Sequence, residues 1–246
     1  MHVFAKLTRS EFRLLLREPM QLFWIFVFPS LLVVILGCVP PFRKPNADLG
    51  GLRVVDLYVA IAIILTLASL ALQVAPMVLA TYRERGILRR LATTPVRPVT
   101  LLGAQLVMSL LTAIGSVVLL LLVGRLVFDV ALPRQGAGFA VAFLATAGAA
   151  FALGLFVAAV APGGKAANTI GTLLFFPLMF FAGLWTPREV FPEVLRRIAD
   201  LTPLGAGERA VQDAMSGQWP AWGSLTVLVA YMLVFGLAAA RLFRWE

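Results

Sequence analysis

The side chains that usually carry catalysis are nearly absent from this sequence. Among 246 residues there is one histidine, His2, and one cysteine, Cys38. An intramembrane hydrolase needs a nucleophile with a base, or a set of metal ligands. The nearest approach to a phosphate-binding loop, "APGGKAAN" at 161–168, has Ala166 where serine or threonine must hold magnesium. We therefore predict no catalytic residue, no metal site and no cofactor bound by this chain.

One stretch, "TYRERGILRRLATTPVRP" at Thr81–Pro98, gathers five arginines between two apolar regions. The residues from Glu84 to Thr93 can form a helix of just over two turns, which Pro95 and Pro98 would stop. Two interpretations are open. The arginines can act only as a topology signal, which their spacing alone favours, or the helix can be a rigid knob that fits a partner protein.

Two polar stripes and one aromatic cluster could line a path for a solute. The first stripe is Thr66, Ser69 and Gln73, and the second is Gln105, Ser109, Thr112 and Ser116. Serine and threonine often form hydrogen bonds between membrane helices, an interpretation that we favour for the second stripe. The cluster suits a large apolar substrate, but lipid or subunit packing explains it equally well; its members are Phe175, Phe176, Met179 and Phe180.

Composition indicates the elements that must position these residues. Hydrophobic residues make up 61% of the chain and charged residues 13%, against about 25% charged residues in soluble domains. Six stretches without Asp, Glu, Lys or Arg are long enough to cross a bilayer. We predict an all-α integral membrane protein with a single domain, 1–246. Its spans are expected at about 20–40, 57–80, 100–123, 138–160, 168–185 and 221–241.

The basic residues predict the orientation of these six spans. The side that holds both termini and the Thr81–Pro98 segment carries 12 of the 21 basic residues and four of the 12 acidic residues. The positive-inside rule places this side in the cytoplasm, in a multi-pass protein of the cell (plasma) membrane. The basic charge then contacts membrane lipids rather than nucleic acid. No charge falls inside a predicted span, which argues against a proton-coupled secondary transporter.

Two further elements are expected outside the spans. Residues 1–19 have a basic face and an apolar face, which predicts an amphipathic helix at the cytoplasmic interface. An outer helical segment is predicted between the fifth and sixth spans. At its start, "TPRE" at 186–189 fits a capping box in which Thr186 caps the helix.

Three regions resemble the ABC-2 family of ABC-transporter permeases. The strongest is "TYRERGILRRLATTPVRPVTLLGAQL", which looks like the family's hallmark between its second and third spans. "SEFRLLLREPMQLFWIFVFPSLLVVILG" resembles the family's N-terminal helix and first span. "FFAGLWTPREVFPEVLRRIADLTPLGAGERAVQDAM" resembles the segment after the fifth span. The chain departs from the family at Ile87, where threonine is frequent, and at Ala182, where serine is frequent.

The resemblance implies the membrane half of a type V ABC exporter. Two separate ABC ATPase subunits would use ATP and Mg, and a second permease, the same or a paralogue, would complete a dimer. Family substrates favour a drug, antibiotic or lipid over a polysaccharide, as in multidrug efflux. Family permeases line their cavity with the second and fifth spans. The knob would be a cytoplasmic coupling helix that contacts the ATPase through Arg83, Glu84, Arg85, Gly86, Leu88, Arg89, Arg90 and Leu91.

Two alternatives remain on the sequence alone. A membrane-embedded assembly or immunity subunit would bind partners without moving a solute. A secondary transporter is the weaker alternative because the spans lack charge.

Overall fold

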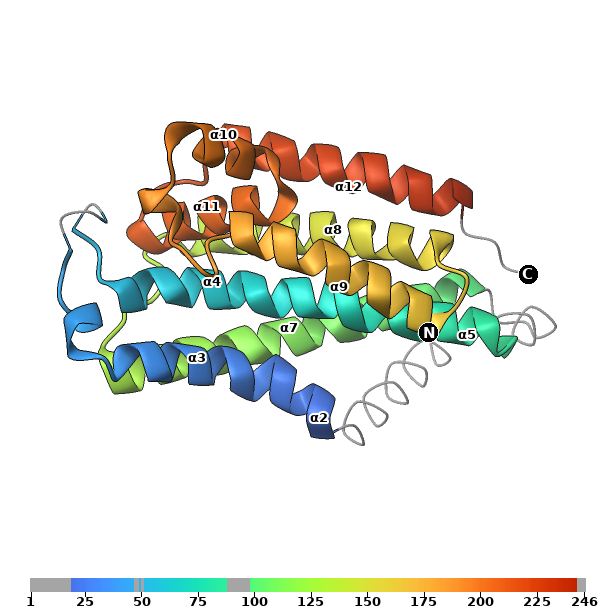
Figure 1. Ribbon diagram of the computed structural model, residues 1–246, viewed down its shortest axis with the longest axis horizontal. Helices are drawn as coiled ribbons and strands as arrows, with labels where there is room; N and C mark the ends of the chain where they lie inside the picture. Colours follow the sequence, from blue (N-terminus) through green and yellow to red (C-terminus); the bar gives the residue numbers. More distant parts are fainter. Residues whose placement is uncertain (1–18, 47–48, 50, 88–97, 243–246) are drawn as a thin grey trace.

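A computed structural model of the chain, which describes residues 19–46, 49, 51–87 and 98–242, is a bundle of long helices (Figure 1). These residues form no β-strand, only an isolated bridge between Pro45 and Arg53. The predicted all-α fold class is therefore confirmed for this part of the chain. Within the described residues, five helices are long and apolar enough to cross a membrane: Pro19–Gly37, Val54–Glu84, Leu102–Phe128, Gly136–Val160 and Trp222–Leu242.

The predicted fifth span, 168–185, corresponds to a shorter and more polar helix. Helix α9 runs from Gly164 to Phe181, and its first two turns carry Lys165 and Asn168. It is not among the five helices above, so the six-span layout is not confirmed. The helix ends before residue 185 because Gly183 adopts a φ of +90°, a left-handed conformation that closes a helix.

The first candidate span is a continuous helix with a π-helical turn inside it. It consists of α2 (Pro19–Leu22), η1 (Phe23–Val27) and α3 (Phe28–Gly37). Pro29 has no backbone N–H, so the carbonyl of Ile25, four residues earlier, loses its usual helical donor. The helix accommodates this loss with the wider, π-helical turn η1. Prolines and π-turns commonly bend long helices in this way.

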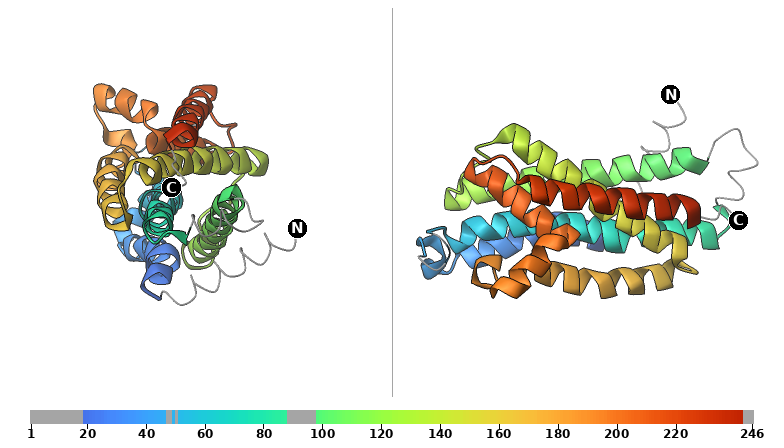
Figure 2. Two further views of the ribbon diagram at one scale, coloured as in Figure 1. Left: turned by 90° about the vertical axis from the view of Figure 1, so that its right-hand side faces the viewer. Right: turned by 90° about the horizontal axis from the view of Figure 1, so that it is seen from above.

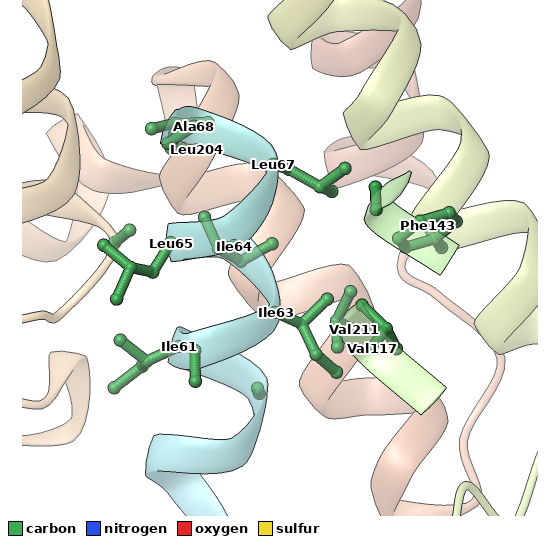
Figure 3. Close-up of a cluster of buried hydrophobic side chains, with 14 of the residues drawn as sticks. Ile61, Ile63, Ile64, Leu65, Leu67, Ala68, Val117, Phe143, Leu204 and Val211 are labelled. Carbon is green, nitrogen blue, oxygen red and sulfur yellow. The ribbon is translucent and has the colours of Figure 1, made fainter. Parts of the chain in front are cut away.

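The second candidate span is the hydrophobic axis of the bundle. It consists of α4 (Val54–Ala68), the π-helical η4 (Ser69–Val74) and α5 (Ala75–Glu84). Its most apolar window is 83% buried. Figure 2 (left) shows this helix enclosed by its neighbours, and Figure 3 shows its side chains pointing to opposite sides, toward several different elements. Ile63 and Leu67 lie in one core cluster with residues of three other helices, Val117, Phe143 and Val211.

Three further long helices complete the framework. α7 (Pro98–Phe128) contacts the first two candidate spans, and α8 (Gly136–Val160) packs closely against α12 (Trp222–Leu242). Alanine and glycine dominate α8, which allows its backbone to approach its neighbours. Only 11% of the most apolar window of α12 is buried, so this helix presents most of its apolar surface outward.

The segment between α9 and α12 folds into short helices at one end of the bundle (Figure 1). They are η5 (Arg188–Val190), α10 (Glu193–Leu201) and α11 (Pro203–Ser216). The capping box predicted at Thr186 is wrong, because the short helix there has no side-chain cap. The capping threonine is Thr202, whose Oγ1 accepts a hydrogen bond from the Gly205 N–H at 3.1 Å and starts α11.

Candidate functional site

The arginine-rich segment begins at a helix end that is fixed to the rest of the bundle. Arg83, in the last turn of α5, donates hydrogen bonds to the carbonyls of Ala158 and Ala159, both at 3.2 Å, and to the carbonyl of Ala161. These carbonyls lie at the C-terminus of α8, where the last C=O groups have no backbone N–H partner within the helix. A guanidinium group there also complements the negative end of the helix dipole.

The next residue binds the beginning of the following helix. Glu84 Oε2 accepts a hydrogen bond from the backbone N–H of Gly164, the first residue of α9, at 3.0 Å. A carboxylate at a helix N-terminus satisfies a free donor and the positive end of the dipole. The fit is close, because a Cβ on Gly164 would overlap Thr81 Oγ1. Adjacent side chains of α5 therefore hold both ends of the α8–α9 turn.

The eight predicted ATPase-coupling residues divide into two groups. Arg83 and Glu84 contact the α8–α9 turn, while Arg85 is exposed and Gly86 adopts a φ of +66° just beyond α5. The other four lie outside the described residues: Leu88, Arg89, Arg90 and Leu91. A contact of any of the eight with an ATPase stays a prediction.

The polar stripe of the second span is only partly accessible. Thr66 is fully buried and donates a hydrogen bond to the Ala62 carbonyl at 3.0 Å. Ser69 and Gln73 of η4 are half-buried, and the Ser69 hydroxyl donates a hydrogen bond to the Leu65 carbonyl at 2.8 Å. Because most of this span is buried, these two residues are among the few polar positions at which it can contact a molecule outside the chain.

The aromatic cluster of α9 also divides between core and surface. Met179 and Phe175 are buried in the main core, whereas the side chain of Phe176 is 53% exposed. The Phe176 ring lies 6.1 Å from the Trp185 ring. Phe180 is half-buried and stacks on Phe191 with centroids 5.3 Å apart. Phe176 and Phe180 are therefore the accessible members of the cluster.

The polar stripe of α7 faces inward. Its four members, Gln105, Ser109, Thr112 and Ser116, are all buried. Ser116 Oγ donates to the carbonyl of Ile25 at 2.6 Å, so it supplies the donor that Pro29 removes from the first span. The interhelical hydrogen bond predicted for this stripe is thus present at Ser116.

A buried charge cluster in the segment after α9 was not predicted. Arg188 Nη1 donates to Glu208 at 3.1 Å and to the carbonyl of Gly205 at 2.7 Å, and Arg188 Nη2 pairs with Asp200. Both Arg188 and Glu208 are buried, beside a cavity of about 250 Å³. Burial raises the pKa of Glu208 to about 7, although the nearby Arg188 guanidinium opposes that rise.

One sequence signal could have revealed this cluster. Leu204, Glu208, Val211 and Met215 recur at spacings of three and four residues, so Glu208 lies on the apolar stripe of α11. A carboxylate in that position must be buried and therefore needs a cationic partner. No comparable pattern marks Arg188 as that partner, because it lies in a short, proline-flanked segment.

Long apolar helices around a buried second span define a multi-helix integral membrane protein. The residues that the structure describes contain no cluster of potential metal ligands. The family model of the ABC-2 type transporter matches residues 2–216, so the chain belongs to that family. The chain is also 22% identical to the "Putative transport permease YvfS" of Bacillus subtilis (strain 168) over 238 residues, which cover 96% of this chain and 95% of that protein. The family and this relative support a transporter permease.

Proposed function

We propose that the chain is the membrane permease subunit of an ATP-driven ABC exporter. α9 serves as the fifth of six spans, and both termini face the cytoplasm. Two separate ABC ATPase subunits supply energy from ATP and Mg, and a second permease, the same or a paralogue, completes the transport path. The family match over residues 2–216 supports this assembly.

The observation that carries the proposal is the attachment of α5 to the α8–α9 turn. The Thr81–Pro98 segment begins in the last turn of α5, and its residues Arg83 and Glu84 bind α8 and α9. A push that an ATPase applies to this segment therefore acts on three long helices. A loop that served only as a topology signal would need its positive charge and none of these contacts.

The accessible residues suggest a path for a hydrophobic or amphipathic substrate. On the half-buried face of the second span, the Gln73 amide can donate and accept hydrogen bonds and the Ser69 oxygen can accept one, while Phe176 and Phe180 offer apolar surface on α9. This mixture suits a drug, an antibiotic or a lipid better than a polysaccharide. Thr66, Phe175 and Met179 support these residues from the core.

The test is ATP hydrolysis by the purified complex. The permease is co-expressed with a candidate ABC ATPase, reconstituted in liposomes, and assayed with an amphipathic fluorescent dye and with a fluorescent phospholipid. We expect either probe to stimulate hydrolysis in the wild type. Phe176→Ala should change the ratio between the two stimulations, whereas Leu228→Met, a substitution of a buried residue on α12 outside this cluster, should leave that ratio unchanged. A stable complex whose hydrolysis neither probe alters would instead favour the assembly or immunity subunit.

A further inference from the structure

The second span is divided into two halves by its π-helical turn. Pro76 has no backbone N–H, so the carbonyl of Leu72 loses its helical donor. The hydrogen-bond register shifts, and the N–H of Ala75 bonds to the carbonyl of Leu70, five residues earlier. π-Turns are frequent at functional sites, and long helices kink at such turns and at prolines. α5 is therefore a half-helix that can tilt relative to α4.

The carbonyls at this turn lie against glycines of two other helices. The carbonyl of Ala71 faces Gly154 of α8, and the carbonyl of Leu72 faces Gly171 of α9. A Cβ on either glycine would overlap the facing carbonyl oxygen. The hinge is thus packed directly on the backbones of α8 and α9, with Cα–H groups beside the freed carbonyls.

The opposite end of α5 is attached to the same two helices. Arg83 binds the last carbonyls of α8, and Glu84 binds the first N–H of α9. α5 therefore contacts α8 and α9 at its hinge and again at its tip. A helix held at both ends to two neighbours moves with them.

We propose that Arg83 and Glu84 form a clasp that transmits movement of the arginine-rich segment to α9, with Ser69–Val74 as the hinge. The proposal rests on the proposed function and assigns both residues as positioning residues rather than as ATPase contacts. The clasp moves the end of α9 that precedes Phe176 and Phe180. It thereby links the segment that an ATPase would push to the residues that would line the path.

Glu84→Ala in the assembled permease–ATPase complex tests the clasp through two readouts. The first is hydrogen exchange of the amides at 164–167, which we expect to accelerate at least fivefold because Gly164 loses its acceptor. The second is the number of dye molecules exported per ATP hydrolysed, which we expect to fall at least threefold. Glu84→Gln keeps an oxygen acceptor, so it should restore part of the protection from exchange and part of the export ratio. Lys165→Gln, an exposed neighbour on α9, is the matched control and should change neither.

The outcomes separate the clasp from the proposed function. Unchanged exchange at 164–167 in Glu84→Ala would show that the clasp does not hold α9. Faster exchange with an unchanged export ratio would show that the clasp is structural and transmits nothing. A wild-type complex that exports no probe would overturn the proposed function, whereas the exchange measurement would still report on the clasp itself.

Discussion

The guanidinium group of Arg188 lies 3.1 Å from the carboxylate of Glu208, and both side chains are buried. The pair joins η5 to α11, which packs against α8 and α4 in the interior of the bundle. Charged groups rarely lie so deep unless they are paired and hydrogen-bonded. This pair therefore fixes the position of the segment between α9 and α12.

Removing one partner should be more harmful than removing both. Arg188→Met leaves a buried carboxylate without a cation, which costs about 3–5 kcal/mol of unfolding free energy. Arg188→Met combined with Glu208→Leu replaces the pair by apolar groups and should recover much of that loss. Apparent melting temperatures of the purified protein at pH 8 measure the difference. A double variant less stable than Arg188→Met would contradict the coupling.

Glu208 should make the stability of the protein depend on pH. Its pKa is about 7 in the fold against an ordinary value of 4.5, because burial disfavours the charged form. The fold therefore favours the protonated form of Glu208. The stabilisation that this preference contributes is complete below pH 4.5 and is lost as the pH rises through about 7. Between pH 5.5 and 8 the loss is about 2 kcal/mol.

Thermal unfolding of the wild type and of Glu208→Gln across this range checks that dependence. The amide stays neutral at every pH, so the melting temperature of the variant should depend on pH much less. Six other charged residues surround the cavity beside Glu208 and are unchanged in the variant: Arg188, Glu189, Arg196, Asp200, Arg209 and Asp213. Equal slopes for the two proteins would assign the pH dependence to another group.

The glycines that face the hinge carbonyls should tolerate no side chain. Gly171→Ala places a methyl group on the backbone of Leu72, and such overpacking costs about 1–3 kcal/mol. Gly236→Ala is the matched control, because no atom lies within 4 Å of its added Cβ. Alanine there should stabilise α12 by about 0.5–1 kcal/mol. Melting temperatures that fall equally in both variants would contradict the close approach of α9 to η4.

The helical membrane fold follows from the sequence, but the hydrogen-bond register of the second span does not. Apolar length and the scarcity of charge suffice to predict a helical membrane protein, since only such helices satisfy every backbone group in lipid. The π-turns had a local cause in Pro29 and Pro76, four residues after Ile25 and Leu72. How each turn packs depends on the group that lies against its freed carbonyl. Ser116 donates a hydrogen bond to the carbonyl of Ile25, and Gly171 lies against the carbonyl of Leu72.

The site could be predicted as a list of residues rather than as an arrangement. The motif at Thr81–Pro98 pointed to Arg83 and Glu84, but their partners lie about 80 positions away in the sequence. The aromatic composition of the predicted fifth span placed Phe175 and Phe176 in one cluster, but only burial by other helices separates the core member from the exposed one. Tertiary packing determines the partners of Arg83 and Glu84 and the difference in burial between Phe175 and Phe176. No local sequence pattern predicts these contacts.

The arginine-rich segment should serve a partner as well as topology. Leu88→Asp places a charge where we expect an apolar contact, so the permease should insert normally and fail to retain or drive the ATPase. Arg89→Lys with Arg90→Lys keeps the charge and loses the planar bidentate geometry of arginine. A lost contact of this kind costs about 2–5 kcal/mol, or more than tenfold in binding. Co-purification of the ATPase measures the loss, and normal retention in Leu88→Asp would leave the segment as a topology signal.

ATP-dependent transport by the reconstituted complex tests the central claim most directly. The permease and its ATPase are placed in liposomes with the ATP-binding side outward, and accumulation of the amphipathic dye is followed with and without ATP. An ATPase variant that binds but does not hydrolyse ATP is the control. We predict that the dye accumulates inside the liposomes only with ATP and an active ATPase, and that Phe176→Ala changes its rate. A correctly assembled complex that hydrolyses ATP without moving any tested hydrophobic or amphipathic probe would contradict the account.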